Sequence, residues 1–346
     1  MKYVDLHSSE SVTLKVESSP VWEVILGISG YTHSQLRHTF EFDELWGVNK
    51  ESMSNSLREA LNEIERTNLW YGLIMLQDKI AAENLEDFSS RLSTMNEREF
   101  YEALLPYKDR EREQLRNNLI NQLGNERNFE GYAAYFKGHE YLENYILILE
   151  AYSQERLSQL FNCIVTEWYE WISTFKEWTK WNQALAFEEK QYTSLEITNL
   201  LDTIETITGG VKYLPEPSIW TVKLVPQVSY KPWTLTLRTA DTKLFFYPLK
   251  DEYLLEPGTP PTDLIRGHKA LGDEVRLKIL HQLKKGPCSL QDLSNQFNIS
   301  KTTIHHQLSL LKAAKFVRVE KGVYSIEFNQ LEAFSELLLK FLGDVT

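Results

Sequence analysis

The stretch from Cys288 to Phe328 constrains the fold most strongly, because it combines two short helical patterns with a β-hairpin pattern. Leu290, Leu293 and Phe297 recur at helical spacing directly after Ser289, a residue type that caps helix N-termini. This spacing predicts one short amphipathic helix.

A second helix is expected just after Asn298, because asparagine tolerates the left-handed backbone of a tight corner between helices. Ser300 would cap this helix, and Ile304, Leu308 and Leu311 would form its buried stripe. Its outward face would be small, polar and cationic, without a carboxylate. Such a face suits a polyanion and offers hydrogen-bond donors to base edges in a DNA major groove.

A β-hairpin pattern follows the second helix, with two β-rich runs on either side of a Lys321-Gly322 turn. The hairpin tip would bring Lys321 near Arg318, where both cations could reach phosphate and position the protein on DNA. Together the two helices and the hairpin predict a winged helix-turn-helix. The alternative is a pair of hairpins, one helical and one β, without a nucleic-acid role.

Residues 286–319 resemble the winged helix-turn-helix of the ArsR/SmtB transcriptional regulators. The shared features are an Asp-Leu pair, a Ser-led second helix, a Leu-x-x-Leu ridge and an Ala-x-Phe-Val exit, here Asp292, Leu293, Ser300, Leu308, Leu311 and Ala314 to Val317. Residues 270–286 also resemble the Leu-Gly-Asp-x-x-Arg-x-x-Ile-Leu opening helix of that family. The resemblance implies a bacterial transcriptional regulator, expected to be a repressor, that binds double-stranded DNA as a homodimer.

The residues expected to contact DNA lie on the second helix, at its ends and in the wing. For base contacts we expect Thr302, Thr303, His305, His306 and Ser309, and for phosphate contacts Lys301, Lys312, Arg318 and Lys321. Ser289 and Tyr324 complete the predicted DNA-binding set. Two such modules in a dimer predict a pseudo-palindromic operator with half-sites roughly 34–36 Å apart, or a multiple of that distance.

The charge distribution supports this interpretation, although the formal net charge of the whole chain is −12. Residues 262–328 contain 11 Lys and Arg against 6 Asp and Glu, so they carry +5 and the rest of the chain carries −17. A basic module on an acidic body is the expected footprint of DNA binding confined to one module.

The chain of 346 residues is long enough for two domains that each bury a core. We expect a helix-rich effector or partner domain over 1–251, a Pro-rich linker over 252–261 and the winged helix-turn-helix over 262–346. The predicted fold class is α+β and mainly α, with a small antiparallel β-sheet in the first domain. In that sheet an N-terminal strand around Leu14 would pair with strands between Trp220 and Tyr247.

Aromatic residues mark one long helix, expected from about Glu155 to Phe187. Its seam consists of Trp168, Trp171, Phe175, Trp178 and Trp181, at spacings of three and four residues. One interpretation is core packing, since each ring buries a large apolar area. The other is that Trp168, Trp171, Phe175 and Trp178 line a pocket for a small apolar effector.

A second resemblance lies in residues 222–251, which are similar to a segment of ArsR-type regulators that carry a long N-terminal domain. Val225-Pro226-Gln227 and Tyr247-Pro248 are the matching motifs. No chemistry for the larger domain follows from this likeness.

Dimerisation is expected through the first and last helices of the C-terminal domain, because these form the interface in the resembled family. The candidate residues are apolar: Leu264, Ile265, Leu338 and Phe341. The alternative is that the apolar last helix packs on the larger domain of the same chain.

Metal sensing is not expected. The Cys-x-Cys positions of the resembled family correspond here to Ser289 and Gln291, and Cys288 alone supplies too few soft ligands. The last helix lacks the Asp and His ligands of the family's other metal site. A smaller departure is Lys315, where the family usually has glycine after the recognition helix.

No catalytic motif is recognisable, so no catalytic residues and no cofactor are expected and the protein is interpreted as a non-enzyme. Only two cysteines and no long apolar stretch predict a cytoplasmic protein without a membrane segment. The alternative hypothesis places the function in the N-terminal domain, as an interaction module or unrecognised enzyme, with the winged helix as a protein-docking module.

Overall fold

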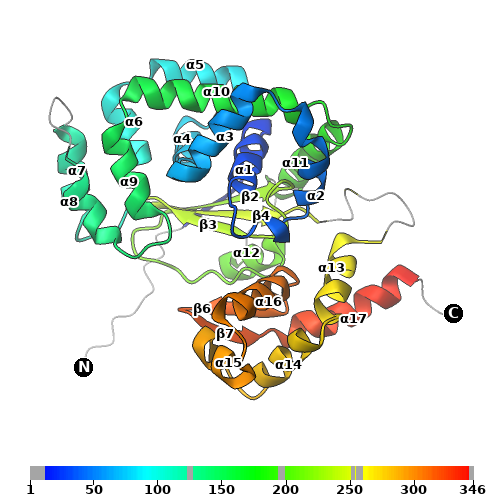
Figure 1. The fold of residues 1–346 in the computed structure, drawn as a ribbon. Helices are drawn as coiled ribbons and strands as arrows, with labels where there is room; N and C mark the ends of the chain where they lie inside the picture. The colour runs from blue at the N-terminus through cyan, green and yellow to red at the C-terminus, as the bar shows by residue number, and fades with distance from the viewer. Residues whose placement is uncertain (1–11, 123–127, 194–198, 251–253, 255–259, 343–346) are drawn as a thin grey trace. The chain divides into compact units, whose positions relative to one another are not determined.

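The computed structural model describes residues 12–122, 128–193, 199–250, 254 and 260–342 (Figure 1). Two compact units make up the chain. The first comprises Met1–Arg37 and Phe42–Leu249, and the second comprises His38–Glu41 and Lys250–Thr346. Most of the predicted linker at 252–261 lies outside the described residues.

Helices dominate the first unit. Among its described residues they are α1 (Pro20–Tyr31), α2 (Asp43–Asn49), α3 (Asn55–Thr67), α4 (Trp70–Ile80), α5 (Leu85–Thr94), α6 (Glu97–Leu104), α7 (Glu113–Asn121), α8 (Glu130–Ala133), α9 (Leu142–Ala151), α10 (Gln154–Ile172), α11 (Trp178–Thr193) and α12 (Leu200–Thr208). Short 3₁₀ helices lie at η2 (Lys50–Ser52) and η3 (Ala134–Phe136), and η1 (Arg37–Thr39) begins in the first unit and ends in the second.

A four-stranded sheet in the order β1-β2-β4-β3 joins the two ends of the first unit. Its strands are β1 (Thr13–Val16), β2 (Thr221–Gln227), β3 (Leu235–Arg238) and β4 (Thr242–Pro248). The predicted N-terminal strand joins the sheet, with Thr13 opposite Thr221. The expectation of an antiparallel sheet holds only for β3 and β4, because β1, β2 and β4 run parallel and β3 returns along the outer edge of β4.

Helices cover both faces of this sheet, and Figure 1 shows α1 and α12 on opposite sides. On the α1 side, the rings of Trp22 and Phe246 lie 5.2 Å apart between centroids. On the α12 side, Ile204 and Ile207 pack with Val222 of β2. Because side chains alternate along a strand, β2 and β4 contribute to two cores at once.

The predicted long aromatic helix is divided in two. It ends at Ile172, the last residue of α10, and resumes at Trp178, the first residue of α11. At the break the backbone N–H groups of Thr174 and Phe175 donate to the carbonyls only three residues back, those of Trp171 and Ile172, and the hydroxyl of Thr174 also donates to the Trp171 carbonyl at 2.7 Å. Regular aromatic spacing therefore did not imply a continuous helix, because short polar side chains compete for backbone partners.

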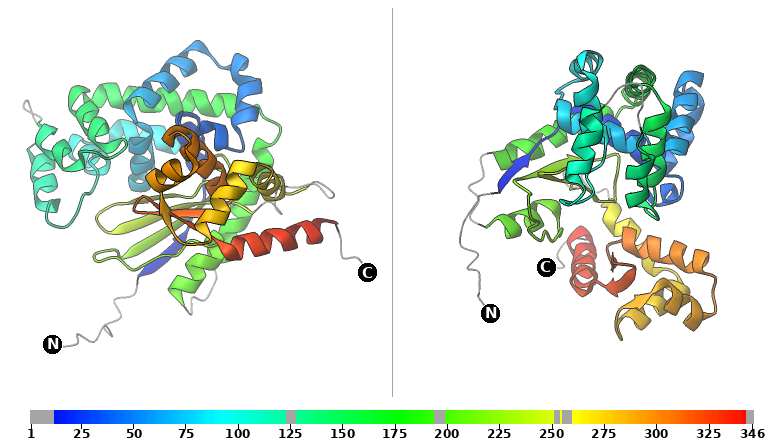
Figure 2. Two further views of the ribbon diagram at one scale, coloured as in Figure 1. Left: turned by 60° about the horizontal axis from the view of Figure 1, so that its bottom comes forward. Right: turned by 90° about the vertical axis from the view of Figure 1, so that its left-hand side faces the viewer.

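The second unit contains α13 (Thr262–Leu271), α14 (Glu274–Leu283), α15 (Leu290–Phe297), α16 (Lys301–Ala313) and α17 (Phe328–Leu342). Strands β5 (Cys288–Ser289), β6 (Val317–Glu320) and β7 (Val323–Ile326) form an antiparallel sheet in the order β5-β7-β6. The hydrophobic core of the second unit includes Ile279, Leu293, Ile304 and Leu311. This is the predicted winged helix-turn-helix, and Figure 2 shows α17, in red, following the hairpin at its edge.

Candidate nucleic-acid interface

Local hydrogen bonds fix the start of α15. The backbone N–H of Asp292 donates to the hydroxyl of Ser289 at 3.2 Å, and the backbone N–H of Ser289 donates to the Asp292 carboxylate at 3.0 Å. Hydrogen bonds from the side chain and backbone of Ser289 hold the pKa of Asp292 below its usual value. This reciprocal cap orients α15 at the edge of the β-sheet.

The turn between α15 and α16 depends on Asn298, which has the left-handed backbone predicted for it, with φ 53°. The hydroxyl of Ser294 donates to the carbonyl of Ile299 at 2.7 Å and closes the turn. Ser300 then caps α16 by accepting the backbone N–H of Thr303 at 3.2 Å. These contacts set the angle at which α16 leaves the turn.

Helix α16 has one buried stripe and one polar, cationic face. Ile304, Leu308 and Leu311 are buried as predicted. Exposed side chains fill the opposite face over its first two turns: Lys301, Thr302, Thr303, His305 and His306. This face brings together hydrogen-bonding and cationic groups without an acidic residue of α16 among them, as contact with the base edges of DNA requires.

The position predicted for Ser309 on that face is wrong. Its side chain is buried, and its hydroxyl donates to the carbonyl of His305 at 2.9 Å. Serine inside a helix often bonds back to the preceding turn, and that bond removes Ser309 from the exposed group.

The wing is a two-residue hairpin with Lys321 and Gly322 at its tip. Both residues have positive φ, 49° and 80°, as a tight turn between twisted strands requires. Lys321 is exposed at the tip. Tyr324 is half-buried on β7, and burial raises the pKa of its hydroxyl.

Arg318 already has acidic partners within the wing. Its Nε lies 2.9 Å from a carboxylate oxygen of Glu327, and its Nη1 lies 3.6 Å from Glu320. Half of the side chain is exposed, so these ion pairs are weak and compete with phosphate rather than exclude it. Lys312 is half-buried on α16.

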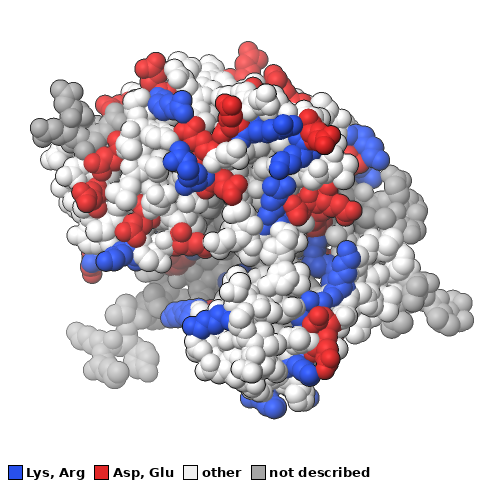
Figure 3. All heavy atoms as spheres, in the orientation of Figure 1, with Lys and Arg blue, Asp and Glu red and all other residues white. Residues whose placement is uncertain are grey.

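Figure 3 shows that the two units carry charge differently on the face that it draws. Over the first unit, Lys and Arg alternate with Asp and Glu. Over the second unit, Lys and Arg predominate. This agrees with the excess of Lys and Arg over Asp and Glu in residues 262–328.

Sequence reasoning missed Arg276 as the residue that joins α13 and α14 to α16. Its guanidinium donates to the carbonyls of Lys269 and Ala270 and to the side chain of Gln307, each at 2.7 Å. The arginine of the Leu-Gly-Asp-x-x-Arg pattern was the available signal. Its hydrogen bonds position α16 without placing Arg276 on the exposed face.

Lys315 has a left-handed backbone, with φ 62°, a conformation that glycine adopts more easily than lysine. A lysine in this region carries backbone strain. Its ammonium lies 3.4 Å from a carboxylate oxygen of Asp263 on α13. This contact ties the exit of α16 to the first helix of the module.

The four predicted dimer-interface residues differ in exposure. Leu264 is buried and Leu338 is half-buried, whereas Ile265 and Phe341 are exposed by 42% and 37%. Helices α13 and α17 meet through the Phe334 ring, which lies 5.0 Å from the ring of His268. The dimer interface itself stays a prediction.

The aromatic residues proposed for an effector pocket lie in the core of the first unit. Trp168, Trp171, Phe175 and Trp178 are all buried, and Trp168 is fully so. The Trp168 and Trp171 rings are 5.0 Å apart, and Trp171 lies 4.9 Å from Phe175. A ligand would have to displace these contacts, and the apolar pocket stays a prediction.

Within the described part of the chain, no group of three or more His, Cys, Asp or Glu is arranged to hold a metal ion. No helix in the same residues has the length and apolar character of a membrane span.

Comparison with known proteins agrees with this geometry. The model of the arsR family of bacterial regulatory proteins matches residues 273–319. The transcriptional repressor SdpR of Bacillus subtilis (strain 168) is 37% identical over 79 residues, which are 22% of this chain and 88% of SdpR. The chain belongs to the arsR family. It is a DNA-binding transcriptional regulator, and the family model matches no residue of its first unit.

Proposed function

We propose that this arsR-family protein is a homodimeric transcriptional repressor that recognises a pseudo-palindromic operator through α16 and does not sense a metal. The observation that carries the proposal is the exposed, carboxylate-free face of α16, from Lys301 to His306. The similarity to a protein named as a repressor supports repression rather than activation of transcription.

Within this proposal, Thr302, Thr303, His305 and His306 contact base edges in the major groove. Lys301, Lys312, Arg318 and Lys321 contact phosphates, and these contacts give binding its salt dependence. Ser289 and Tyr324 lie beside the wing, where their remaining polar groups contact the backbone. Ser309 supports the helix from within rather than contacting a base.

The first unit would bind an effector or partner and change the affinity of the dimer for DNA. Such coupling requires a ligand that binds two arrangements of the dimer with different affinity. Leu264, Ile265, Leu338 and Phe341 are the proposed interface residues. The exposed surfaces of Ile265 and Phe341 support that assignment.

The test is fluorescence anisotropy of the full chain on the DNA upstream of its own gene, titrated with salt and compared with random-sequence DNA. The wild type should prefer the upstream DNA and lose affinity steeply as salt rises. The Thr302→Ala/His306→Ala variant should lose the preference while keeping most of the salt-dependent binding. No binding to either DNA at low salt would refute the proposal.

A further inference from the structure

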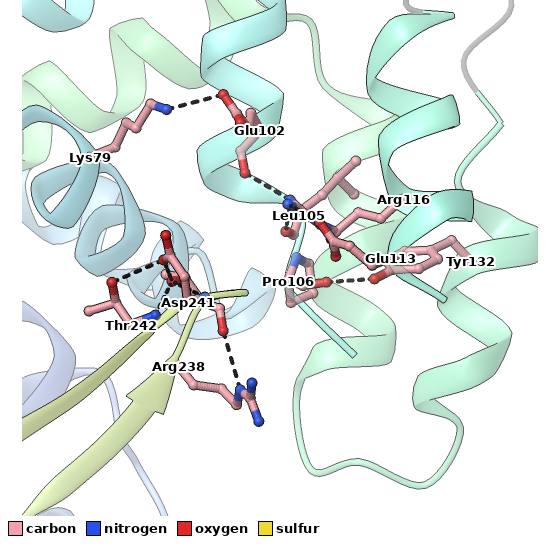
Figure 4. Close-up of polar contacts among 11 residues, drawn as sticks. Lys79, Glu102, Leu105, Pro106, Glu113, Arg116, Tyr132, Arg238, Asp241 and Thr242 are labelled. Carbon is pink, nitrogen blue, oxygen red and sulfur yellow. Dashed lines mark hydrogen bonds and ion pairs between the residues drawn. The ribbon is translucent and has the colours of Figure 1, made fainter. Parts of the chain in front are cut away.

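A polar cavity of about 500 Å³ lies within the first unit (Figure 4). Its walls come from α4, the end of α6, α7, β2 and the turn between β3 and β4, and include Asp78, Tyr107, Lys223, Arg238 and Asp241. The volume is within the range of small-molecule sites in proteins. Neither the family match nor the DNA-binding role accounts for it.

Two cations share one carboxylate beside the cavity: Arg238, which lines it, and Lys243, which does not. The carboxylate of Glu216 accepts both Nη1 of Arg238, at 2.7 Å, and Nζ of Lys243, at 2.5 Å. Nη2 of Arg238 has no hydrogen-bond partner among the described residues, and the guanidinium lies 4.4 Å over the Tyr107 ring. Nη2 itself is buried and Nε donates to the carbonyl of Thr239 at 3.2 Å, but 27% of the Arg238 side chain stays exposed and the residue lines the cavity, so an anion can approach the guanidinium from there.

Another part of the wall has more anions than cations. Nζ of Lys223 lies 2.6 Å from Asp78 and 3.5 Å from Glu17, so two carboxylates share one ammonium. Asp241 accepts hydrogen bonds from the hydroxyls of Thr239 and Thr242, each at 3.0 Å, and has no cationic partner among the described residues.

Hydrogen bonds hold the opposite wall of the cavity in place. Arg116 binds Glu113 through two hydrogen bonds of 2.9 and 3.0 Å and also donates to the carbonyls of Glu102 and Leu105. The hydroxyl of Tyr132 donates to the carbonyl of Pro106 at 2.7 Å. Figure 4 shows these residues facing the side that carries Arg238 and Asp241. Such a frame preserves the cavity and lowers the entropic cost of binding.

We propose that this cavity binds a small zwitterion of amino-acid or dipeptide size, with its carboxylate at Arg238 and its ammonium at Asp241. Arg238 and Asp241 lie at the two ends of one tight turn, and an α-amino acid carries its opposite charges on one carbon. Guanidinium and carboxylate groups provide strong charge-assisted hydrogen bonds to such a ligand. The remaining volume accommodates a side chain or a second residue.

This ligand differs in chemistry and place from the apolar effector predicted for the tryptophan seam. The charged groups of the cavity disfavour an apolar ligand, because covering them would cost their solvation without replacing it. Ligand binding by the first unit can be measured without DNA, so its failure would be distinguishable from a failure of the proposed DNA-binding function.

Isothermal titration calorimetry of the full chain tests the proposal, with the common L-amino acids and their glycyl dipeptides as probes. At least one probe should bind, and its N-acetylated and C-amidated forms should bind at least about tenfold more weakly, because each lacks one charge. Asp241→Asn, which is nearly isosteric, should weaken the same probe by a similar factor. Arg238→Gln should do so too.

Arg156→Gln is the matched control, since Arg156 also pairs with a carboxylate, Glu63, but does not line the cavity. It should leave binding unchanged. The proposal is wrong if no probe binds at millimolar concentration, if the blocked forms bind equally well, or if Asp241→Asn retains full affinity. Binding of inorganic phosphate or a nucleotide alone would also overturn it.

Discussion

The exposed face of α16 and the cavity of the first unit both concentrate charged residues, yet they arrange them in opposite ways. On α16 the polar and cationic side chains follow one another along one short segment and point to solvent. Around the cavity, ions come from distant segments, and Lys223 meets Asp78 across 145 residues of sequence. A local pattern can thus reveal a surface for an external polyanion, whereas an internal charge network becomes visible only after folding.

The strongest test of this contrast reverses charge on the DNA-binding module. Lys301→Glu/Lys321→Glu should weaken DNA binding by about 100-fold or more, because it replaces two cations near phosphate with anions. Anisotropy at several salt concentrations would also show a smaller salt slope.

Lys137→Glu/Lys212→Glu is the control, since it changes the net charge equally at two exposed sites of the first unit. It should alter affinity only slightly. Equal loss in both double variants would mean that net charge, and not the face of α16, determines binding.

A second comparison probes packing in each unit through one glycine. A Cβ at Gly267 would lie 2.1 Å from Cε2 of Phe334, and a Cβ at Gly27 would lie 2.9 Å from Nε1 of Trp168. Each substitution to alanine should lower the free energy of unfolding of its own unit by about 1–3 kcal/mol, because buried rings must move.

Tryptophan fluorescence separates the two effects, since all 9 tryptophans precede residue 250. Gly27→Ala should shift the fluorescence transition in urea, and Gly267→Ala should shift only the far-UV circular dichroism transition. Gly131→Ala, in α8, where a Cβ meets nothing within 4 Å, should lower neither transition, because alanine favours a helix more than glycine does. A fluorescence shift in Gly267→Ala would show that the units unfold together.

A third test concerns the ion pairs beside the cavity. Burial lowers the pKa of Lys223, but the attraction of Asp78 and Glu17 outweighs it, so the pKa lies above the usual value. Asp78→Asn should cost about 1–3 kcal/mol, because it leaves a mostly buried ammonium with only the Glu17 carboxylate, 3.5 Å away.

The pH dependence of this pair has a definite sign. A raised lysine pKa stabilises the folded chain below the unfolded pKa of about 10.4, and the stabilisation is lost as pH rises through the folded pKa. Urea unfolding at neutral pH and above pH 10 should show this loss in the wild type and less of it in Asp78→Asn. An equal loss in both would exclude the ion pair as its cause.

The smallest effect is expected at the cap of α15. Because Ser289 holds the pKa of Asp292 below its usual value, the cap stabilises the fold at neutral pH and weakens as pH falls through that lowered pKa. Carbon-13 NMR of the Asp292 carboxyl should give a low titration midpoint that rises in Ser289→Ala. An unchanged midpoint in that variant would contradict the reciprocal cap.

The sequence-based predictions were confirmed where the contacting residues lie close together along the chain. Ser289 and Asp292 are three residues apart, and Ile304, Leu308 and Leu311 lie within two turns of one helix. Each of these features depends on neighbours that the sequence itself places together. Even here Ser309 was misplaced, because helical periodicity gives a direction but not the local hydrogen bond that its hydroxyl makes.

In the first unit, the pairing of the strands and the continuity of one helix could not be predicted from the sequence. Its helical character and its closing sheet followed from composition and alternation, but the parallel pairing of Thr221 with Thr242 did not. The break after Ile172 was also missed. Strand order and helix interruption depend on which distant surfaces become buried together, and a single segment does not contain that information.

The sequence by itself determined the winged helix-turn-helix, its caps, its basic character and its family, because those properties arise from residues within a few turns of each other. Only the tertiary structure revealed the three hydrogen bonds of Arg276 and the charged cavity, and only it showed that the tryptophan seam, for which the sequence left two interpretations, is buried. These features require side chains from distant segments to come within hydrogen-bonding or van der Waals distance, and the collapse of the whole chain decides which of them do.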